Sequence, residues 1–279
     1  MTPSGAKGSR GAAGVRSPRV RAARQLAKRA FRERAKCFLA EGPQAVREAL
    51  RQPGVVTELF TTGAAAARHT GLAEQAAADG IAVHEVSGEI MAELAQTITP
   101  QGVLAVCRFI DVPLAKLAAA DPALVVVLAN VRDPGNAGTV LRTADAAGAQ
   151  GVVFAAASVD PYNSKCVRSS AGSLFHLPVV AGVPLTETVS TLHGSGLWVL
   201  AADGSAARSV DAAARAGELA GPTAWLFGNE AWGLPAELLE LADEALAVPI
   251  YGQAESLNLA AAAAVCLYAS ATSQRSAGG

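Results

Sequence analysis

The stretch that decides the fold is residues 248–259, which read VPIYGQAESLNL and lead into an alanine-rich run ending at Ala269. The apolar residues before it predict a strand over 244–248. That strand should stop at Pro249, because proline cannot donate a hydrogen bond to a neighbouring strand. A polar loop follows, and the apolar run then predicts a helix over 257–270.

Two polar side chains mark the start of this predicted helix. Ser256 is a suitable N-cap, because its hydroxyl can accept a hydrogen bond from a backbone N–H of the first turn. Asn258 then lies in the first turn of an otherwise apolar helix. Taken alone, the stretch fits an ordinary capped core helix, but such an N-terminus is also a site for an electron-rich group.

The second half of the chain alternates between strand and helix patterns. Residues 124–129 form a run of Leu, Val and Ala, which is typical of a strand buried on both faces. Further strands are predicted over 152–155, 177–180, 197–201, 224–227 and 244–248, and helices over 137–147, 164–171, 185–193, 236–241 and 257–270. This alternation predicts an α/β fold with a mostly parallel sheet covered on both faces.

The first half predicts a smaller α/β unit. Strands are expected over 55–61, 81–85 and 103–109, and helices over 18–36, 44–51, 65–79 and 88–96. The resulting domain prediction is a disordered basic tail over 1–17, a small domain over 18–109, a linker over 110–122 and a larger domain over 123–273.

Charge is distributed unevenly along the chain. Residues 1–36 hold 11 of the 23 Lys and Arg residues but one of the 24 Asp and Glu residues, although the net charge is −1. A basic arm on an acidic body indicates a polyanionic partner such as RNA. The alternative is a solvated tail without a specific role.

Composition excludes several classes of protein. The four cysteines and four histidines are scattered without metal-ligand spacing, so no metal and no disulfide framework is expected. The apolar run over 259–269 is about half the ~20 residues of a membrane span. No signal peptide pattern is visible, and the chain is expected to be cytoplasmic, with an organellar transit peptide as a minor alternative.

Three polar clusters each follow a predicted buried strand. They are residues 130–142, 225–235 and 248–259. In an open parallel sheet, ligands bind beyond the carboxyl ends of the strands. The first cluster offers Asn136 as a helix cap and Arg142 as a phosphate clamp, or alternatively as an ordinary solvated arginine.

The second cluster offers a glycine and a carboxylate. Gly228 permits a close backbone approach or a positive φ, and Glu230 is the acid of the same turn. Neither GxGxxG nor GxxxxGK[ST] nor GxSxG is present, so a dinucleotide fold, a P-loop and an α/β-hydrolase elbow are not supported.

In this order, the three clusters resemble the three motifs of the SpoU/TrmH family of S-adenosylmethionine-dependent RNA ribose 2′-O-methyltransferases. The matching stretches are residues 136–142, 227–234 and 248–258. Residues 160–172 and 38–43 also look like the family, so the resemblance covers roughly residues 20–272. Alanine at 231, where the family commonly has glycine, is a mild departure.

The resemblance implies a fold, a cofactor and an assembly. It implies a trefoil knot at the carboxyl end, which is an exception to the rule that chains do not thread loops. It implies S-adenosylmethionine bound in that knot and a homodimer whose active sites draw on both subunits. The implied cofactor contacts are Leu226, Gly228, Val248, Ile250 and Leu257.

The resemblance also implies catalytic roles for Arg142, Asn136, Glu230, Ser256 and Asn258. Family reasoning makes Arg142 the base, but a guanidinium does not readily lose its proton. We therefore favour a charged Arg142 that clamps phosphate and stabilises the alkoxide. The expected substrate is large-subunit ribosomal RNA, with transfer RNA as the alternative. Rival hypotheses are methylation of a base nitrogen and a catalytically silent RNA-binding or ribosome-assembly protein.

Overall fold

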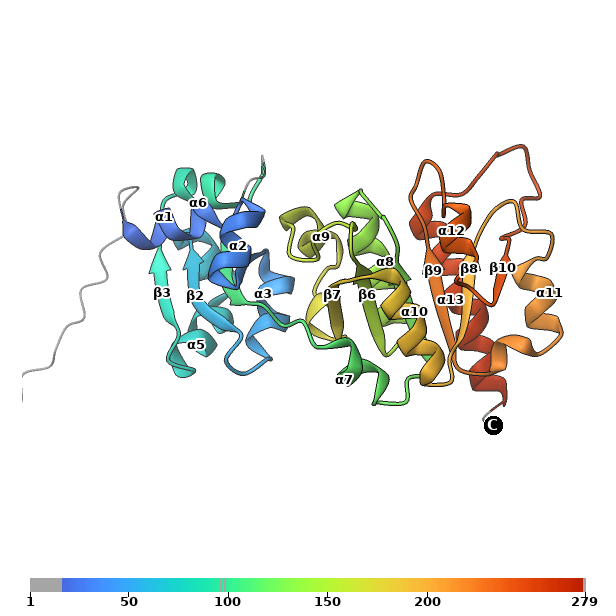
Figure 1. Cartoon of the computed structure of the whole chain (residues 1–279). Coiled ribbons are helices and arrows are strands. Elements are labelled where there is room, and N and C mark those ends of the chain that lie inside the picture. The colour runs from blue at the N-terminus through green and yellow to red at the C-terminus, as the bar shows by residue number, and fades with distance from the viewer. Residues whose placement is uncertain (1–16, 96, 98, 278–279) are drawn as a thin grey trace, which may run out of the picture. The chain divides into compact units, whose positions relative to one another are not determined.

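The computed structural model describes residues 17–95, 97 and 99–277 (Figure 1). The chain divides into two compact units, Met1–Phe109 and Ile110–Gly279. Apart from Ser17, the predicted disordered tail lies outside the described residues. Within those residues, no helix combines the length and the hydropathy that a membrane crossing requires.

The first unit is built on a four-stranded mixed sheet in the order β1-β4-β2-β3. β2 pairs in parallel with β3 and antiparallel with β4, which also pairs antiparallel with β1. Its elements are α1 Pro18–Gln25, α2 Arg29–Ala35, β1 Cys37–Glu41, α3 Pro43–Leu50, β2 Val56–Thr61, α4 Gly63–Arg68, α5 Thr70–Ala78, β3 Ala82–Glu85, α6 Gly88–Ala95 and β4 Val103–Arg108. β1 was not predicted, because its five residues carry too little pattern to separate a strand from a loop.

The basic segment is part of this folded unit from Ser17 onward. Val20, Ala23 and Leu26 are buried in the same core as Phe60 and Met91. The single helix predicted over 18–36 is interrupted at residues 26–28, so α1 and α2 are separate. The apolar stripe of α1 therefore anchors the segment, and its arginines project from a fixed surface.

The second unit contains a six-stranded sheet in the order β10-β8-β9-β5-β6-β7. Every pairing in it is parallel, which confirms the predicted parallel α/β fold. Its elements are α7 Leu114–Ala118, β5 Leu124–Leu128, α8 Pro134–Ala147, β6 Gly151–Ala155, α9 Ser164–Ser169, η1 Ser173–Phe175, β7 Val179–Val183, α10 Leu185–Gly194, β8 Trp198–Ala202, α11 Val210–Arg215, η2 Glu218–Ala220, β9 Thr223–Phe227, α12 Ala236–Leu239, β10 Glu244–Leu246 and α13 Leu259–Ala277.

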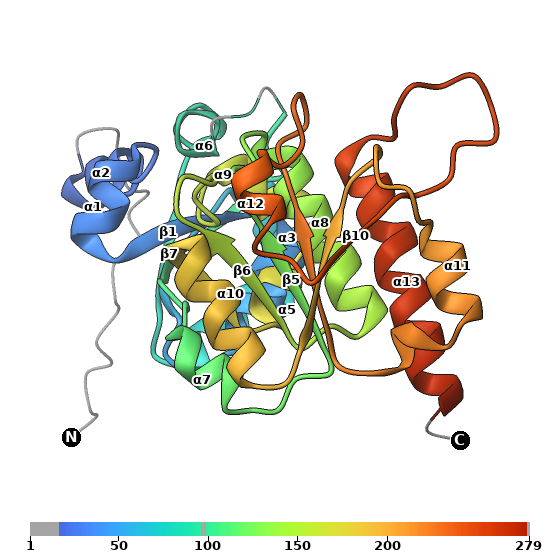
Figure 2. The same ribbon diagram turned by 45° about the vertical axis from the view of Figure 1, so that its right-hand side comes forward.

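Helices cover both faces of this sheet (Figure 2). On one face, apolar side chains of α7, α10 and α12 pack against alternate strand residues such as Val125 and Val127. On the other face lie α8 and α13, which contact each other along their length. Trp225 of β9 is fully buried there, and its Nε1 donates to Ser270 Oγ of α13 at 2.9 Å.

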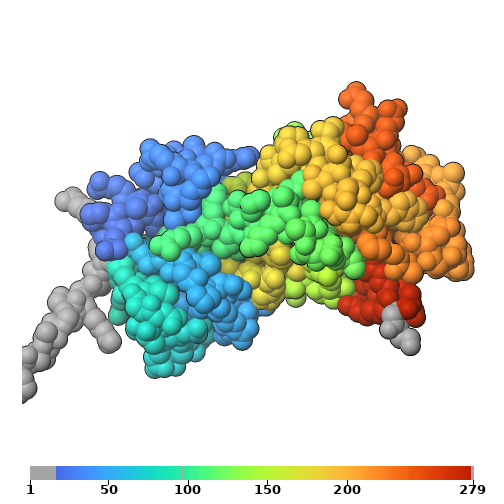
Figure 3. Space-filling model, turned by 60° about the horizontal axis from the view of Figure 1, so that its bottom comes forward, coloured from blue at the N-terminus to red at the C-terminus, as the bar shows by residue number. Residues whose placement is uncertain are grey.

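Residues 110–122, which the sequence suggested as a linker, belong to the second unit. They contain α7, whose Leu114 and Leu117 are buried in the core of that unit. In the space-filling view this green segment lies closely against the yellow surface of α10 (Figure 3). The two prolines flanking α7 disguised it, because a five-residue helix has too few turns to show a period.

The last helix begins later than predicted. α13 starts at Leu259, and the side-chain Oδ1 of Asn258 accepts from the backbone N–H of Ala260 at 2.9 Å. Asn258 is therefore the N-cap, and the prediction that Ser256 fills this role is wrong. Both residues are good caps, and the local pattern could not choose between them.

Candidate functional site

Three loops gather at the carboxyl edge of the parallel sheet. β5 and β9 are direct neighbours, with Leu128 opposite Phe227, so the loops that follow them leave the sheet side by side. The loop after β10 leads to α13. The three polar clusters of the sequence are these three loops, and the tertiary structure joins them through side-chain hydrogen bonds.

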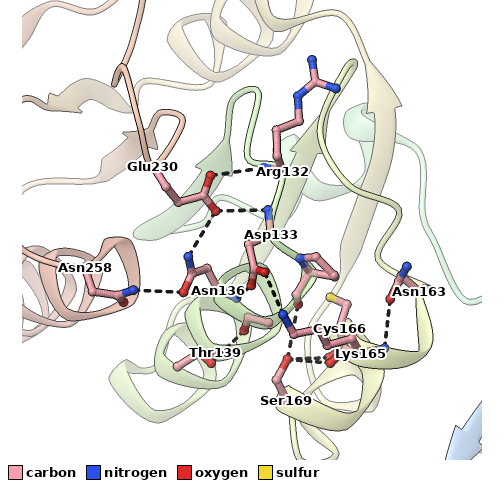
Figure 4. A network of polar contacts seen from close by, with 12 residues as sticks. Arg132, Asp133, Asn136, Thr139, Asn163, Lys165, Cys166, Ser169, Glu230 and Asn258 are labelled. Atoms are coloured by element: carbon pink, nitrogen blue, oxygen red, sulfur yellow. Dashed lines mark hydrogen bonds and ion pairs between the residues drawn. The ribbon is translucent and has the colours of Figure 1, made fainter. Parts of the chain in front are cut away.

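Glu230 lies in the second loop and holds the first loop through hydrogen bonds. Its carboxylate accepts from the backbone N–H groups of Arg132 and Asp133, at 3.4 and 3.2 Å. It also accepts from Nδ2 of Asn136 at 3.2 Å (Figure 4). A carboxylate has enough lone pairs for all three donors. Glu230 therefore holds the start of α8 in place rather than projecting freely into solvent.

Asn136 connects the second and third loops. While its Nδ2 donates to Glu230, its Oδ1 accepts from Nδ2 of Asn258 at 3.1 Å (Figure 4). These two bonds use both ends of the Asn136 amide and fix its orientation. The chain Glu230–Asn136–Asn258 thus joins one residue from each of the three motifs.

Asp133, and not Asn136, caps α8. Asp133 Oδ1 accepts from the backbone N–H of Asn136 at 2.8 Å, and Pro134 occupies the first helical position. The sequence offered this signal, because Asp before Pro is a common helix start. The interpretation of Asn136 as the cap is wrong, and its side chain is consequently available for the polar network.

Lys165 of α9 supports this cap. Its Nζ lies 2.7 Å from Asp133 Oδ2. The hydrogen bond from Lys165, followed by that from the Asn136 backbone, holds the pKa of Asp133 below its usual value. Sequence reasoning missed Lys165 because ion-pair partners 32 residues apart leave no local pattern.

α9 lies very close to α8 at Gly138. A Cβ there would lie 2.0 Å from Ser169 Oγ and 2.3 Å from the backbone oxygen of Cys166. Glycine at 138 therefore serves helix packing. This contact also places the α9 residues next to the first motif.

The loop after β9 is a tight turn closed by backbone bonds. Asn229 and Gly233 exchange N–H···O=C bonds at 2.9 Å in both directions. A Cβ on Gly228 would lie 2.4 Å from the carbonyl carbon of Gly233, so the predicted close approach at Gly228 is confirmed, and it is to the chain's own backbone. Gly233 itself has a φ of 68°.

Asn229 is a site residue that sequence reasoning missed. It is 6% exposed, and its Nδ2 donates to the backbone oxygen of Asn130 at 3.0 Å. Its Oδ1 accepts from the N–H of Ala231 at 2.9 Å. An asparagine two residues after a buried strand was the available signal, and its buried amide ties the second loop to the first.

A cavity of about 360 Å³ opens between the second loop, the third loop and the end of β8. Of the predicted cofactor contacts, Gly228, Val248, Ile250 and Leu257 line it, as do Glu230 and Ser256. Leu226 does not. Its side chain packs into the core on the α10 face, because successive strand residues point to opposite faces.

Arg142 stands apart from this network. It is exposed on α8, and no hydrogen bond or ion pair of its side chain is found in the part of the chain that the structure describes. Six residues are about 1.7 helical turns, so Arg142 and Asn136 lie on different sides of α8. Arg142 instead shares the side of Gly138, one turn away, which faces α9.

The chain matches two family models. Residues 123–268 match the SpoU rRNA methylase family, and residues 17–105 match an MRM3-like substrate-binding domain. The 23S rRNA (guanosine(2553)-2′-O)-methyltransferase RlmP of Bacillus subtilis is 37% identical over 91% of this chain and 96% of its own length.

Solved structures agree with this match. An S-adenosylmethionine-bound rRNA methyltransferase from Sinorhizobium meliloti superimposes with a TM-score of 0.80, at 30% identity over 92% of this chain and 95% of that one. The SpoU methyltransferase AviRb from Streptomyces viridochromogenes, in complex with the same cofactor, gives a TM-score of 0.78 at 29% identity over 94% and 99%.

A parallel α/β unit with three polar loops beside a cavity, together with these matches, defines a methyltransferase. The chain belongs to the SpoU rRNA methylase family. The predicted family and class of enzyme are thereby confirmed.

Proposed function

We propose that this protein transfers a methyl group from S-adenosylmethionine to a ribose 2′-hydroxyl of large-subunit ribosomal RNA. The observation that carries the proposal is the bonded series Glu230–Asn136–Asn258, in which Glu230 also lines the cavity. It unites the three motif loops around one place. Curated relatives such as RlmP, and the RlmB enzymes of other bacteria, are named as guanosine methyltransferases of 23S rRNA, which favours a guanosine target.

The cavity fits the cofactor in size and in charge. Its volume lies within the range of ligand pockets, and its walls combine backbone at Gly228 with the apolar side chains of Val248, Ile250 and Leu257. The carboxylates of Asp203 and Glu255 also line it, and they suit a ligand that carries a sulfonium and an amino group. The bound cofactor would supply an electrophilic methyl group.

The chain's own residues must position and activate the ribose. A hydroxyl is a poor nucleophile, so donors aimed at its developing negative charge accelerate the reaction. Ser256 offers its hydroxyl to the ribose, and the amides of Asn136 and Asn258 each keep a second N–H donor and a second lone pair for it. Arg142 binds the neighbouring phosphate through its planar, positively charged fork and stabilises the developing alkoxide, and the 2′-hydroxyl proton passes to water as the oxygen accepts the methyl group.

The separation of Arg142 from the cavity of its own chain supports a homodimer. A second subunit would bring its Arg142 to this cavity, as the family resemblance implies. Exposed apolar side chains on α13 and on the loop before it, Val265, Tyr268, Ile250 and Leu257, offer material for the interface. We propose in addition that the chain is knotted at its carboxyl end and works in the cytoplasm, where ribosomes are.

The first unit is proposed to bind RNA through α1 and α2. Arg21, Lys28 and Arg34 are exposed, whereas Arg19 and Arg29 form ion pairs with Glu58 and Glu33. Phosphate contacts of exposed cations give salt-dependent affinity without sequence information. Replacing Arg21, Lys28 and Arg34 with Gln together should flatten the salt dependence of RNA binding, and this variant leaves Val20 and Leu26 in the core.

Mapping ribose methylation in total RNA, with and without the gene, tests the proposal. Loss of one 2′-O-methyl in large-subunit RNA, restored by the wild-type gene, supports it. A lost mark in transfer RNA would redirect the substrate, and an unchanged ribose map with a lost base methyl would replace the reaction. Ribose methylation blocks alkaline cleavage at the modified nucleotide, whereas base methylation does not.

Variants of Arg142 test its assigned role. Arg142→Lys keeps the charge but loses the bidentate fork, so turnover should fall at least tenfold, and Arg142→Ala should lose more. Normal turnover of the Lys variant would contradict the clamp. Calorimetric titration with S-adenosylmethionine separates an enzyme from a silent RNA-binding protein, since the latter has no need of the cofactor.

A further inference from the structure

Trp232 is an exposed indole at the rim of the cavity. It is 61% exposed, whereas Trp225 is fully buried and Trp198 is half-buried. It also lines the cavity beside Glu230, two residues away in the same loop. An aromatic ring of this size normally contributes to a core, so its exposure next to a candidate site requires an explanation.

The backbone of the turn that carries Trp232 is held by hydrogen bonds and by a close packing contact. The reciprocal backbone bonds between Asn229 and Gly233 close the turn, and Asn229 Oδ1 holds the N–H of Ala231. The close contact at Gly228 packs the base of the loop against residues 233 and 234. The ring is therefore presented by a constrained turn, so RNA binding does not have to order the backbone that carries it.

We propose that Trp232 stacks on a base of the RNA substrate, either the target nucleotide or its neighbour. This inference rests on the proposed function, because it concerns the substrate of the same site. Proteins bind unstacked RNA bases on aromatic side chains, and such stacking tolerates any base because each has a π-face. Glu230 in the same turn holds Asn136, so a ribose positioned by Asn136 would have its base near the indole.

The exposure of the ring favours RNA over the cofactor as its partner. A ligand enclosed in the cavity would contact the part of the indole that lines the wall. Most of the ring lies outside, where a larger substrate approaches. Trp232 is thus a substrate-binding residue, and it is assigned no part in the chemical step.

Two substitutions of Trp232 separate the contribution of its aromatic face to RNA binding from that of its apolar volume. Trp232→Phe keeps an aromatic face, and Trp232→Leu removes it while retaining an apolar side chain. With unmodified large-subunit ribosomal RNA as substrate, the Leu variant should raise KM for RNA by about 5- to 150-fold, the range expected for loss of one base stack. The Phe variant should recover most of that loss, and kcat at saturating RNA should change little in both.

Tryptophan fluorescence gives a readout independent of methyl transfer. The difference in emission between wild type and Trp232→Phe isolates Trp232, and the same RNA should protect that emission from quenching by iodide. Trp198→Phe is the matched control. Trp198 is the first residue of β8, so it lies at the amino end of the strand, whereas the cavity lies at the carboxyl end. That substitution should leave RNA protection and KM unchanged.

Three outcomes would overturn the inference. They are a Leu variant with wild-type KM for RNA, a Leu variant whose affinity for S-adenosylmethionine falls in calorimetry, and a Leu variant whose dimer dissociates in light scattering. The second assigns the ring to the cofactor, and the third assigns it to a subunit interface. None of these three outcomes contradicts the proposed function, provided that the wild-type enzyme methylates RNA.

Discussion

Asn258 donates a hydrogen bond from Nδ2 to Oδ1 of Asn136 at 3.1 Å, across 122 residues of sequence. The same Asn258 caps α13 through its Oδ1. One amide therefore serves helix stability with its oxygen and the candidate site with its nitrogen. Because the two ends of the amide are chemically distinct, substitutions can separate the two roles.

Asn258→Asp and Asn258→Ala should differ in stability. Aspartate keeps the capping oxygen and loses the donor, so the variant should unfold close to the wild-type temperature but lose at least tenfold in kcat. Alanine loses both functions and should also destabilise the protein by about 1 kcal/mol. Thermal unfolding and steady-state methylation at saturating RNA measure the two effects. Full activity of the Asp variant would show that the Asn136 contact is dispensable.

Gly228→Ala should impair cofactor binding through the backbone. Its Cβ would lie 2.4 Å from the carbonyl carbon of Gly233, so the turn that lines the cavity must shift. We expect at least a tenfold weaker affinity for S-adenosylmethionine in calorimetric titration. Gly204 lines the same cavity, and a Cβ there meets nothing within 4 Å. Gly204→Ala should therefore stay within about twofold of wild type, and equal losses in both variants would refute a steric cause.

Gly138→Ala should destabilise the packing of α8 on α9. The nearest obstacles to its Cβ are Ser169 Oγ at 2.0 Å and the backbone oxygen of Cys166 at 2.3 Å. The side chain can rotate away but the backbone cannot, so we expect a loss of about 1–3 kcal/mol in urea unfolding. Gly194, the last residue of α10, has open space around it. Gly194→Ala should be neutral or slightly stabilising, and an equally stable Gly138→Ala protein would contradict the packing argument.

The Asp133–Lys165 pair predicts a pH dependence of stability. Lys165 and the capped backbone lower the pKa of Asp133 in the folded state. A lowered folded pKa contributes stability that is present above the ordinary value of about 3.9 and is lost as pH falls through the folded value. Asp133→Asn keeps the cap but removes this contribution.

The free energies of unfolding of wild type and Asp133→Asn should therefore differ at pH 7, and the difference should shrink as the pH falls below about 4. Urea unfolding across that range measures the difference. Lys165→Met should reduce the pH-dependent part, because it removes the largest cause of the shift. A difference that is constant down to pH 3 would show that the ion pair does not contribute.

The sequence by itself determined the parallel α/β unit, because apolar runs such as 124–129 and the helices between them follow from local periodicity. It also determined the three clusters and nearly all the candidate residues, since they follow strands. Gly228 belongs here too, because glycine has few reasons to follow a buried strand other than close backbone approach.

Only the tertiary structure decided which of these residues caps a helix, which packs in the core and which joins the polar network. Judged from the local sequence, Ser256 and Asn258 are equally good N-cap residues. In the folded chain Asn258 is the N-cap, and the same side chain also donates to Asn136. Strand and helix periodicity place Leu226 and Arg142 on a different face from their neighbours, but which face meets the core and which meets the cavity depends on packing partners distant in sequence. The tertiary structure likewise decided the positions of three further residues at the site, which are Lys165, Asn229 and Trp232. Contacts between loops cannot be read from any single loop, since each satisfies its own local chemistry in several ways.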